Sequence, residues 1–247
     1  MAILKKPLFF LLRFFGIRRK GDLIILWYFK NHIFFTIKML RASQSQISQD
    51  VFVSCHLKLW KKESNLRYFV EFGATDGVYL SNTLILEKIF KWNGLLVEPA
   101  SIWAEKLTIN RKSKIDFRCV YNVTGEKIEF NESEDAVYST IDKFSKSDTH
   151  TEKRTYGSRY LVDTVTLNDL LTDHDAPEVI DYLSIDTEGS EYLVLQAVDF
   201  SKWKFKIITV EHNYTPQRAL IKELLYQNGY VRVFENISLM DDWYVQI

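Results

Sequence analysis

Cysteine is scarce in this chain of 247 residues, which contains only Cys55 and Cys119. Two cysteines far apart in the sequence argue against a disulfide framework or a cysteine-based metal site, and they indicate a reducing compartment. Net charge is lacking as well, because 32 basic residues balance 32 acidic ones. The charges are unevenly distributed: residues 1–49 hold nine Lys/Arg and one acid, so the rest of the chain has a net charge of −8. An acidic body argues against broad nucleic-acid binding.

The N-terminal part of the chain is apolar as well as basic. Its two apolar runs are Pro7–Gly16, which is too short to span a bilayer, and Leu23–Leu40. The second run is long enough, but the polar residues Lys30–His32 interrupt its centre, where a charge is costly. No small-residue cleavage site of the signal-peptide type is present. Residues 1–43 are therefore expected to form a helical extension of a cytoplasmic protein. Three alternatives stay open for it: attachment to an anionic membrane surface, packing on the protein or on a second copy, or a transmembrane span.

Residues 44–247 are predicted to form one α/β domain in which strands and helices alternate. Strands are expected at Arg67–Phe72, Leu95–Glu98, Ile115–Tyr121, Ile180–Ile185, Ile207–Val210, Tyr230–Phe234 and Trp243–Ile247. Helices are expected after Ser81, around Trp103 and Leu107, after the capping box Thr166–Asp169, over Glu191–Ala197, and after Thr215 and Pro216. This alternation predicts a mostly parallel sheet with helices on both faces.

The turn after the first strand is the most informative segment. It reads FVEFGATDG over Phe69–Gly77, and GLLVEP follows over Gly94–Pro99. Glycines in such a turn let the backbone pass close to a ligand, and Glu98 follows Gly77 at a separation typical of an acid that binds a ribose. The dinucleotide pattern G-x-G-x-x-G is missing, which argues against a nicotinamide oxidoreductase. A cofactor without a pyrophosphate, such as S-adenosylmethionine, fits better.

Acidic residues follow several of the predicted strands. The strand ends read EFGATDG, VEP, VYN, IDTEGSE and VEHN, and four of these five carry a carboxylate. Because ligands bind at the carboxyl ends of parallel strands, we expect these groups to converge at one edge of the sheet. Unpaired buried carboxylates are costly, so their presence there indicates a function.

Six further pieces of sequence together resemble the FkbM family of S-adenosylmethionine-dependent methyltransferases. They are QISQD (46–50), FVEFGATDGVYLSNTLILEK (69–88), GLLVEP (94–99), DYLSIDTEGSEYLVL (181–195), IITVEHN (207–213) and the closing Gly229-Tyr230 with DDWYV (241–245). The resemblance begins near residue 44. It implies a class I methyltransferase (Rossmann-like) fold with a seven-stranded sheet whose last strand is antiparallel. One departure is Thr75, where the family usually has Asn, and we expect only a local change in the turn.

The resemblance also implies a set of site residues. Those expected to bind the cofactor are Glu71, Gly73, Ala74, Asp76, Gly77, Ser81, Asn82, Glu98, Pro99, Asn122 and Asp186, with Glu98 on the ribose and Asn122 on the adenine. The catalytic candidates are Asp186, Glu188, Glu211 and His212. His212 is the candidate base for a hydroxyl acceptor, with Glu211 or Asp186 orienting it, although a histidine that satisfies a backbone group is an equal alternative. Glu191 is expected to be structural. The acids would permit a divalent ion, but no metal site is predicted.

The polar segment Glu126–Thr155 is expected to be a long excursion, either an acceptor loop over the site or a solvated insert. The sequence therefore predicts an O-methyltransferase that acts on a hydroxyl of a sugar, glycan or glycolipid. Two alternatives stay open: a small secondary metabolite as acceptor, and an interaction subunit that binds the cofactor without turnover.

Overall fold

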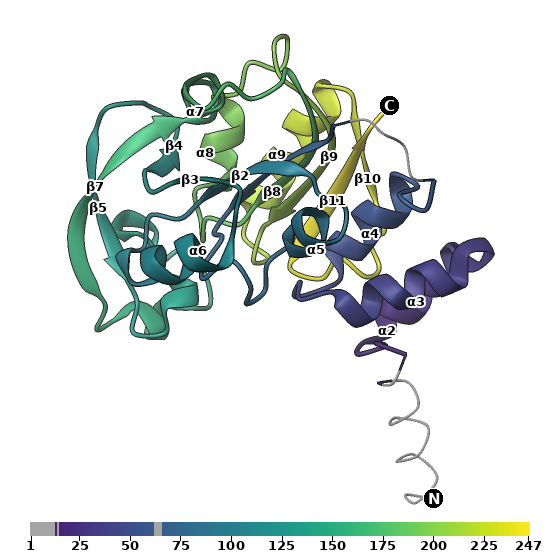
Figure 1. Ribbon diagram of the computed structural model, residues 1–247. Coiled ribbons are helices and arrows are strands. Elements are labelled where there is room, and N and C mark those ends of the chain that lie inside the picture. Colours follow the sequence, from purple (N-terminus) through teal and green to yellow (C-terminus); the bar gives the residue numbers. More distant parts are fainter. Residues whose placement is uncertain (1–12, 14, 62–65) are drawn as a thin grey trace, which may run out of the picture.

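A seven-stranded sheet forms the centre of the computed structural model, which describes residues 13, 15–61 and 66–247 (Figure 1). Its strands, in spatial order, are β10 (Tyr230–Val233), β11 (Asp241–Gln246), β9 (Lys204–Glu211), β8 (Val179–Ile185), β1 (Tyr68–Phe72), β2 (Asn93–Val97) and β3 (Lys114–Asp116). Neighbouring strands are parallel except at β11, which is antiparallel to both β9 and β10. This is the class I methyltransferase sheet that the resemblance implied.

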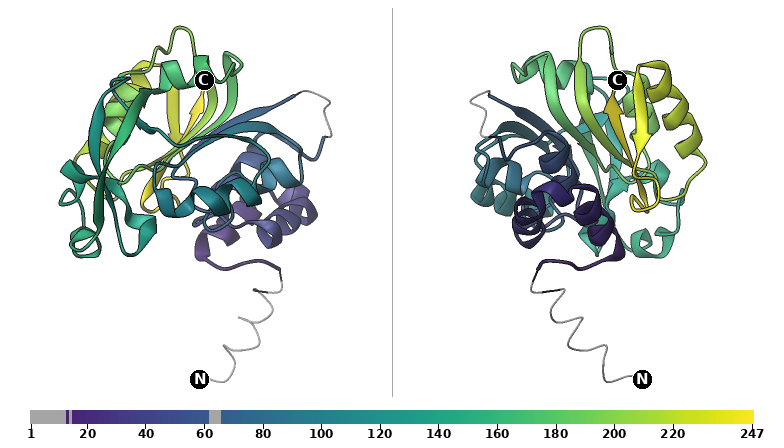
Figure 2. Two further views of the ribbon diagram at one scale, coloured as in Figure 1. Left: turned by 60° about the vertical axis from the view of Figure 1, so that its left-hand side comes forward. Right: turned by 90° about the vertical axis from the view of Figure 1, so that its right-hand side faces the viewer.

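Alternating side chains of the strands face two separate hydrophobic cores. Phe69 of β1 and Tyr182 of β8 belong to one core, which the helices α4 (Gln49–His56), α5 (Leu84–Lys88) and α6 (Ala104–Asn110) cover. The next residues along the strands, Val70 and Leu183, belong to the other core, under α7 (Leu167–Asp173), α8 (Glu191–Gln196) and α9 (Gln217–Gln227). The sheet is thus buried on both faces, as near-continuous apolar strands require (Figure 2).

The predicted strand Ile115–Tyr121 is split, and the reason is a local turn. The Asp116 carboxylate accepts a hydrogen bond from the backbone N–H of Arg118 (2.8 Å), which bends the chain away after β3. The next strand, β4 (Cys119–Tyr121), joins a second sheet of four strands in the order β4-β7-β5-β6. The others are β5 (Lys127–Glu132), β6 (Thr140–Ile141) and β7 (Ser158–Thr166).

The predicted excursion Glu126–Thr155 is largely built into this second sheet. Besides β5 and β6 it contains three short 3-10 helices, η3 (Ala136–Tyr138), η4 (Asp142–Phe144) and η5 (Thr151–Arg154). The sheet has its own small core around Phe130 and Ile141. Of the two alternatives for this segment, the solvated insert was therefore wrong, because the paired strands bury these few apolar side chains.

The N-terminal helices pack on the domain. They are α2 (Lys20–Tyr28), η1 (Lys30–His32) and α3 (Ile33–Ala42), and their buried residues Ile25 and Met39 share one core with Phe69 of β1. Within the described residues no single helix is long and apolar enough to cross a membrane, although the pair 20–28 and 30–42 passes that test together with a bend of 87°. Most of the first apolar run, Pro7–Gly16, lies outside the described residues.

The helix ends test the predicted caps. Thr166 caps α7 by accepting the backbone N–H of Asp169 (3.1 Å), as predicted. The cap of α5 is Thr83 and not Ser81, whose hydroxyl donates to Glu71 instead. The short 3-10 helix η2 (Ser101–Trp103) leads directly into α6. The N-cap of α9 is Pro216, the second of the two residues predicted to precede this helix.

A buried arginine at the end of α6 holds the loop that follows β1. The side chain of Arg111 is fully buried and donates to the carboxylate of Glu87 (3.0 Å), to the Gly77 carbonyl (3.0 Å) and to the hydroxyls of Ser81 and Thr83 (3.1 and 2.9 Å). It therefore fixes the middle and the end of the segment that connects β1 to α5.

Replacing Arg111 by Met should lower the free energy of unfolding by about 3–5 kcal/mol, because it leaves a buried carboxylate and several polar groups without their partner. The control is Lys127→Met, whose side chain is 63% exposed and pairs with Asp163, itself 59% exposed. It should cost about 1 kcal/mol or less. Urea unfolding of both variants would measure the difference, and equal losses would contradict this account of Arg111.

Candidate active site

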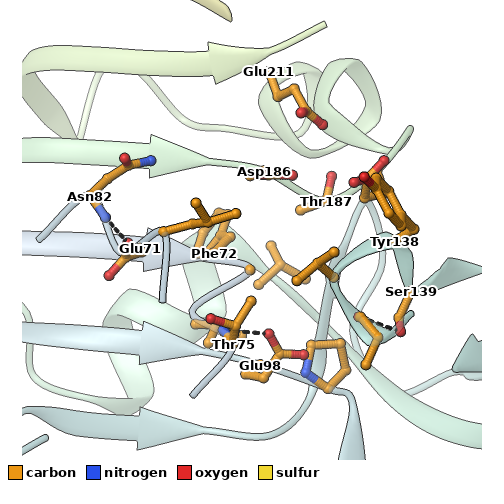
Figure 3. Close-up of a pocket in the computed structure, with 18 of the residues that line it drawn as sticks. Glu71, Phe72, Thr75, Asn82, Glu98, Tyr138, Ser139, Asp186, Thr187 and Glu211 are labelled. Carbon is orange, nitrogen blue, oxygen red and sulfur yellow. Dashed lines mark hydrogen bonds between the residues drawn. The ribbon is translucent and has the colours of Figure 1, made fainter. Parts of the chain in front are cut away.

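A cavity of about 280 Å³ lies at the carboxyl ends of the central strands. Its walls are the turn after β1, the end of β2, the segment Asp186–Glu188 after β8, and Glu211 and Asn213 at the end of β9. Residues of the second sheet close the remaining side. In Figure 3, Tyr138 and Ser139 lie on the opposite side of the cavity from Glu71 and Asn82.

The turn after β1 depends on two glycines with left-handed backbone conformations. Gly73 has φ +71°, and a Cβ there would lie 2.3 Å from the carbonyl oxygen of Asp186. Gly77 has φ +79°, and a Cβ there would lie 2.5 Å from the side chain of Arg111. A side chain at Gly73 would therefore collide with the backbone that follows β8, and one at Gly77 would collide with side chains of α6 and of Arg111 at its end. Thr75, between them, also has a positive φ of 47°, which is unusual for a β-branched residue and marks this turn as strained.

Glu98 lies in the cavity at the end of β2. One of its carboxylate oxygens accepts the backbone N–H of Thr75 (2.8 Å), and the other accepts that of Ala100 (2.9 Å) (Figure 3). Burial raises the pKa of Glu98 to about 7. Each oxygen keeps a lone pair for a further donor, so the group can still accept hydroxyl hydrogen bonds from a ligand.

Glu71 holds the start of the next helix in place. Its carboxylate accepts hydrogen bonds from the backbone N–H of Asn82 (2.5 Å) and from the hydroxyls of Ser81 and Thr83. The amide of Asn82 then donates to Ser184 of β8 (3.0 Å). These contacts position Asn82 in the cavity wall, so Glu71 lines the cavity and also orders the segment beside it.

Three acids form a cluster at the ends of β8 and β9. Carboxylate oxygens of Asp186, Glu188 and Glu211 all lie within 4.8 Å of one another. Burial raises the pKa of Asp186 to about 7, and burial together with repulsion from Asp186 raises the pKa values of Glu188 and Glu211. Asn213 donates from its amide to Glu211 (2.9 Å) and to Glu188 (3.2 Å). The cluster is therefore built to receive protons or a cationic ligand.

Arg154, at the end of η5, brings a fully buried positive charge to this cluster. Its guanidinium donates to Glu188 (2.7 Å), to both oxygens of Asp148 (2.8 and 3.0 Å) and to the carbonyl oxygen of Tyr138 (2.7 Å). It thereby joins the acids of the central sheet to the segment of the second sheet that lines the cavity.

The structure brings eight of the predicted site residues to the cavity and leaves six outside its lining. Those that line it are Glu71, Gly73, Asn82, Glu98, Pro99, Asp186, Glu188 and Glu211. Those outside are Ala74, Asp76, Gly77, Ser81, Asn122 and His212. Several of the latter shape the turn instead: the Asp76 carboxylate, for instance, accepts the backbone N–H groups of Val78 and Tyr79. Asn122 is exposed, and its predicted contact with the adenine stays a prediction.

The predicted base His212 needs correction. Successive side chains of an extended strand point to opposite faces, and Glu211 already points into the cavity. His212 lies on the other side, buried, where its Nδ1 accepts the backbone N–H of Tyr214 (2.9 Å) and its Nε2 is 3.7 Å from Asp242. Burial lowers the pKa of this imidazole. This geometry matches the alternative of a histidine that satisfies a backbone group.

Several lining residues were not predicted as site residues. They are Gln46, Gln49, Thr75, Tyr79, Thr187, Asn213 and Met240, among others. Gln46 and Gln49 belong to the segment QISQD, which the resemblance had marked without assigning a role. From the second sheet come Tyr138 and His150, whose rings stack with centroids 4.4 Å apart. Their position agrees with the expectation that the segment Glu126–Thr155 lies over the site.

The described residues fit S-adenosylmethionine. Glu98 offers acceptors for ribose hydroxyls, and Gly73 keeps the turn free of a side chain where the strands meet. Asp186, Glu188 and Glu211 offer negative charge for the ammonium and sulfonium groups. The same three acids could hold a divalent ion, but Arg154 already occupies one oxygen of Glu188.

The methyltransferase FkbM domain matches residues 71–233, about two-thirds of the chain. The chain belongs to the FkbM methyltransferase family. The match begins at Glu71 and ends in β10, so it contains the second sheet and the acid cluster. The match does not test the predicted boundary between the N-terminal extension (1–43) and the methyltransferase domain (44–247), which stays a prediction. No curated protein matches the chain.

The solved structures that resemble this FkbM chain have low sequence identity to it. The FkbM methyltransferase from Methylobacillus flagellatus KT is 10% identical with a TM-score of 0.44, over 85% of this chain and 54% of that one. A METTL16 MTase domain is 14% identical with a TM-score of 0.43, over 79% and 64%. The N-terminal domain of human METTL16 in complex with SAH is 12% identical with a TM-score of 0.41, over 78% and 66%. The chain thus spans about half to two-thirds of these proteins.

Replacing Arg154 by Met in this FkbM chain should impair the cavity, because it removes the positive charge beside Glu188 and the donor to Tyr138. We expect a loss of about 3 kcal/mol or more in the free energy of unfolding, as for other broken buried ion pairs. We also expect weaker binding of S-adenosylmethionine. The control is Arg159→Met on β7, whose partly exposed side chain pairs with Asp142 of η4. Unchanged cofactor binding by a folded Arg154→Met chain, measured by calorimetry, would contradict this role.

The pKa of Glu98 predicts how the stability of the unliganded chain depends on pH. The folded state holds the Glu98 proton up to about pH 7, whereas the unfolded chain releases it near pH 4. Folded chains therefore bind more protons in this window, and the Glu98 contribution to stability falls as pH rises through it. The histidines with lowered pKa values act in the opposite direction below about pH 6.5. The contribution of Glu98 is therefore measured as the difference in stability between the wild type and Glu98→Gln at each pH.

Thermal unfolding of both chains should show the wild type losing stability relative to Glu98→Gln between about pH 4 and about pH 7, with no further change above. Parallel profiles would show that Glu98 titrates normally.

Proposed function

We propose that this chain transfers a methyl group from S-adenosylmethionine to a hydroxyl of a sugar, as a free sugar, a glycan or a glycolipid. The observation that carries the proposal is one cavity that joins Glu98, the cluster Asp186, Glu188 and Glu211, and a polar wall from the second sheet. Bound S-adenosylmethionine supplies an electrophilic methyl group on a sulfonium.

The residues of the central sheet bind the cofactor in this proposal. Glu98 accepts hydrogen bonds from the ribose hydroxyls, and its deprotonated form is favoured when they donate to it. The turn at Gly73 runs beside the methionine part. The acids at the ends of β8 and β9 compensate the positive charges of the ligand, which in turn releases the protons that burial makes them hold.

Asp186 is the proposed base for the acceptor hydroxyl. A carboxyl group with a pKa of about 7 is partly deprotonated at neutral pH and still basic enough to take a proton, which suits general-base catalysis. Asp186 shares a hydrogen bond with Glu211, and Glu188 is held by Arg154 and Asn213. We assign orientation of the base to these neighbours, because a base must be held within hydrogen-bond reach of the proton it removes.

The second sheet supplies the acceptor side. Tyr138 and His150 stack and present an aromatic face at the cavity, and the Ser139 hydroxyl lies beside them. Gln46, in another part of the cavity wall, adds an amide group. Aromatic faces pack against the C–H face of a sugar ring while amides and hydroxyls bond its hydroxyl groups. This combination favours a sugar over a flat apolar metabolite.

Two substitutions test the proposal. Asp186→Asn should reduce kcat about 10²–10⁴-fold, as expected for the loss of a general base, while S-adenosylmethionine still binds through Glu98, Glu188 and Glu211, more weakly than to the wild type because one carboxylate is lost. His212→Ala should leave kcat within about threefold, because His212 lies outside the cavity and takes no proton in this mechanism. Methyl transfer from labelled cofactor to a panel of sugars would give kcat, and calorimetry would give binding.

Loss of turnover in a folded, cofactor-binding His212→Ala chain would overturn the assignment of the base. Cofactor binding with no methylation of any sugar, but with methylation of a small aromatic or polyketide hydroxyl, would replace the acceptor class. Binding with no product at all would favour a non-catalytic subunit.

A further inference from the structure

A group of large apolar side chains is exposed around the bend between α2 and α3. The group, which we call the N-terminal apolar surface, consists of Leu23, Ile24, Trp27, Tyr28, Ile33 and Phe34. Trp27 is 70% exposed and Phe34 is 88% exposed. Figures 1 and 2 show α2 and α3 as the outer layer beyond α4. Single exposed apolar residues are ordinary, but a contiguous group of this kind marks an interaction site.

The opposite faces of the same helices are fixed to the domain. Ile25 of α2 and Met39 of α3 are buried in the core that contains Phe69. The carboxylate of Asp22 accepts a hydrogen bond from the hydroxyl of Ser48 (2.7 Å), which ties the start of α2 to the segment before α4. The N-terminal apolar surface is therefore held in a fixed orientation.

Positive charge surrounds this surface. Exposed basic side chains on the same helices and just before them are Arg18, Lys20, Lys30 and Lys38. The ammonium of Lys30 lies 5.8 Å from the ring centre of Trp27. Within residues 1–43 of the sequence Asp22 is the only acid, and it is 2% exposed. An aromatic surface bordered by basic groups is complementary to the interface of an anionic bilayer.

We propose that the N-terminal apolar surface docks on the surface of a bilayer that contains anionic phospholipids. The helices lie on the membrane and do not span it: α2 has 9 residues, which at about 1.5 Å per residue is far shorter than a hydrocarbon core of about 30 Å. Their other faces are also occupied by the protein core. A second copy is a poorer partner, because a two-fold contact would bring the same basic groups together.

Docking would fix the position of the cavity relative to the bilayer. The segment that follows α3 contributes Gln46 and Gln49 to the cavity wall. A rigid link of this kind suits an acceptor that is held at a membrane, but the proposal concerns binding alone and is independent of the proposed function.

Flotation of the full chain with vesicles tests the proposal. Vesicles of phosphatidylcholine alone are compared with vesicles that also contain phosphatidylglycerol. We expect binding to the second kind, weakened by salt because part of the attraction is electrostatic. Trp27→Ser/Phe34→Ser should bind at least about tenfold more weakly, since two large apolar side chains no longer insert. Lys30→Glu/Lys38→Glu should also bind about tenfold more weakly, because each basic group near the surface contributes to affinity.

The matched control is Ile109→Ser/Tyr226→Ser, which removes two side chains that are 74% and 66% exposed on α6 and α9. It should bind vesicles as the wild type does. The proposal is overturned if the wild type does not float with anionic vesicles, or if the Trp27/Phe34 variant binds as well as the control. Sedimentation that shows a dimer lost only in the Trp27/Phe34 variant, without vesicle binding, would overturn it in favour of a second copy. All chains should keep the wild-type melting temperature, because the substituted side chains are exposed.

Discussion

The gathering of buried carboxylates at one edge of the central sheet is the constraint on which the site depends. Asp186, Glu188 and Glu211 lie within 4.8 Å of one another, and burial raises the pKa of neighbouring Asp241 to about 8. Uncompensated charge of this density would be costly in a protein interior. Protons compensate it in the unliganded chain, and a ligand with two positive charges, such as S-adenosylmethionine, can replace them. Cofactor binding and proton release are therefore two aspects of the same electrostatic problem.

The second sheet also helps to compensate the charge of these acids. Its buried Arg154 places a fixed positive charge against Glu188, and the hydroxyl of Thr140 donates to the Glu188 carbonyl oxygen (2.8 Å). Glu188 itself has φ 55°, a conformation that costs a non-glycine residue energy and persists only where its surroundings hold it. The elements of the second sheet that line the cavity thus also hold one of the acids that follow β8. A change that moved Arg154 would therefore alter the charge of the cavity.

Local patterns predicted the central sheet, the turn after β1 and the place of Glu98, because glycines, apolar runs and strand-end acids are signals within a few residues. The second sheet was missed because β5 and β7 bury few apolar residues and bond to each other across a long intervening segment. Arg154 lies in the segment predicted as a long excursion, but its partners come from three segments, so its contact with Glu188 could not be predicted. The error at His212 was avoidable: if Glu211 faces the cavity, strand alternation turns its neighbour away.

The segment QISQD has a physical explanation that the sequence did not provide. The hydroxyls of Ser43 and Ser45 donate to the buried carboxylate of Asp50 (2.6 and 2.7 Å), and the amide of Gln49 donates to Asp241 beside the acid cluster (2.7 Å). Buried polar groups of this kind fix orientation because each must find its partner. The hydrogen bonds run from the end of α3 to the cavity wall. The end of α3 and the cavity wall are therefore held together by buried polar contacts of residues 43–50, which is why this short segment is richer in Ser, Gln and Asp than a surface linker needs to be.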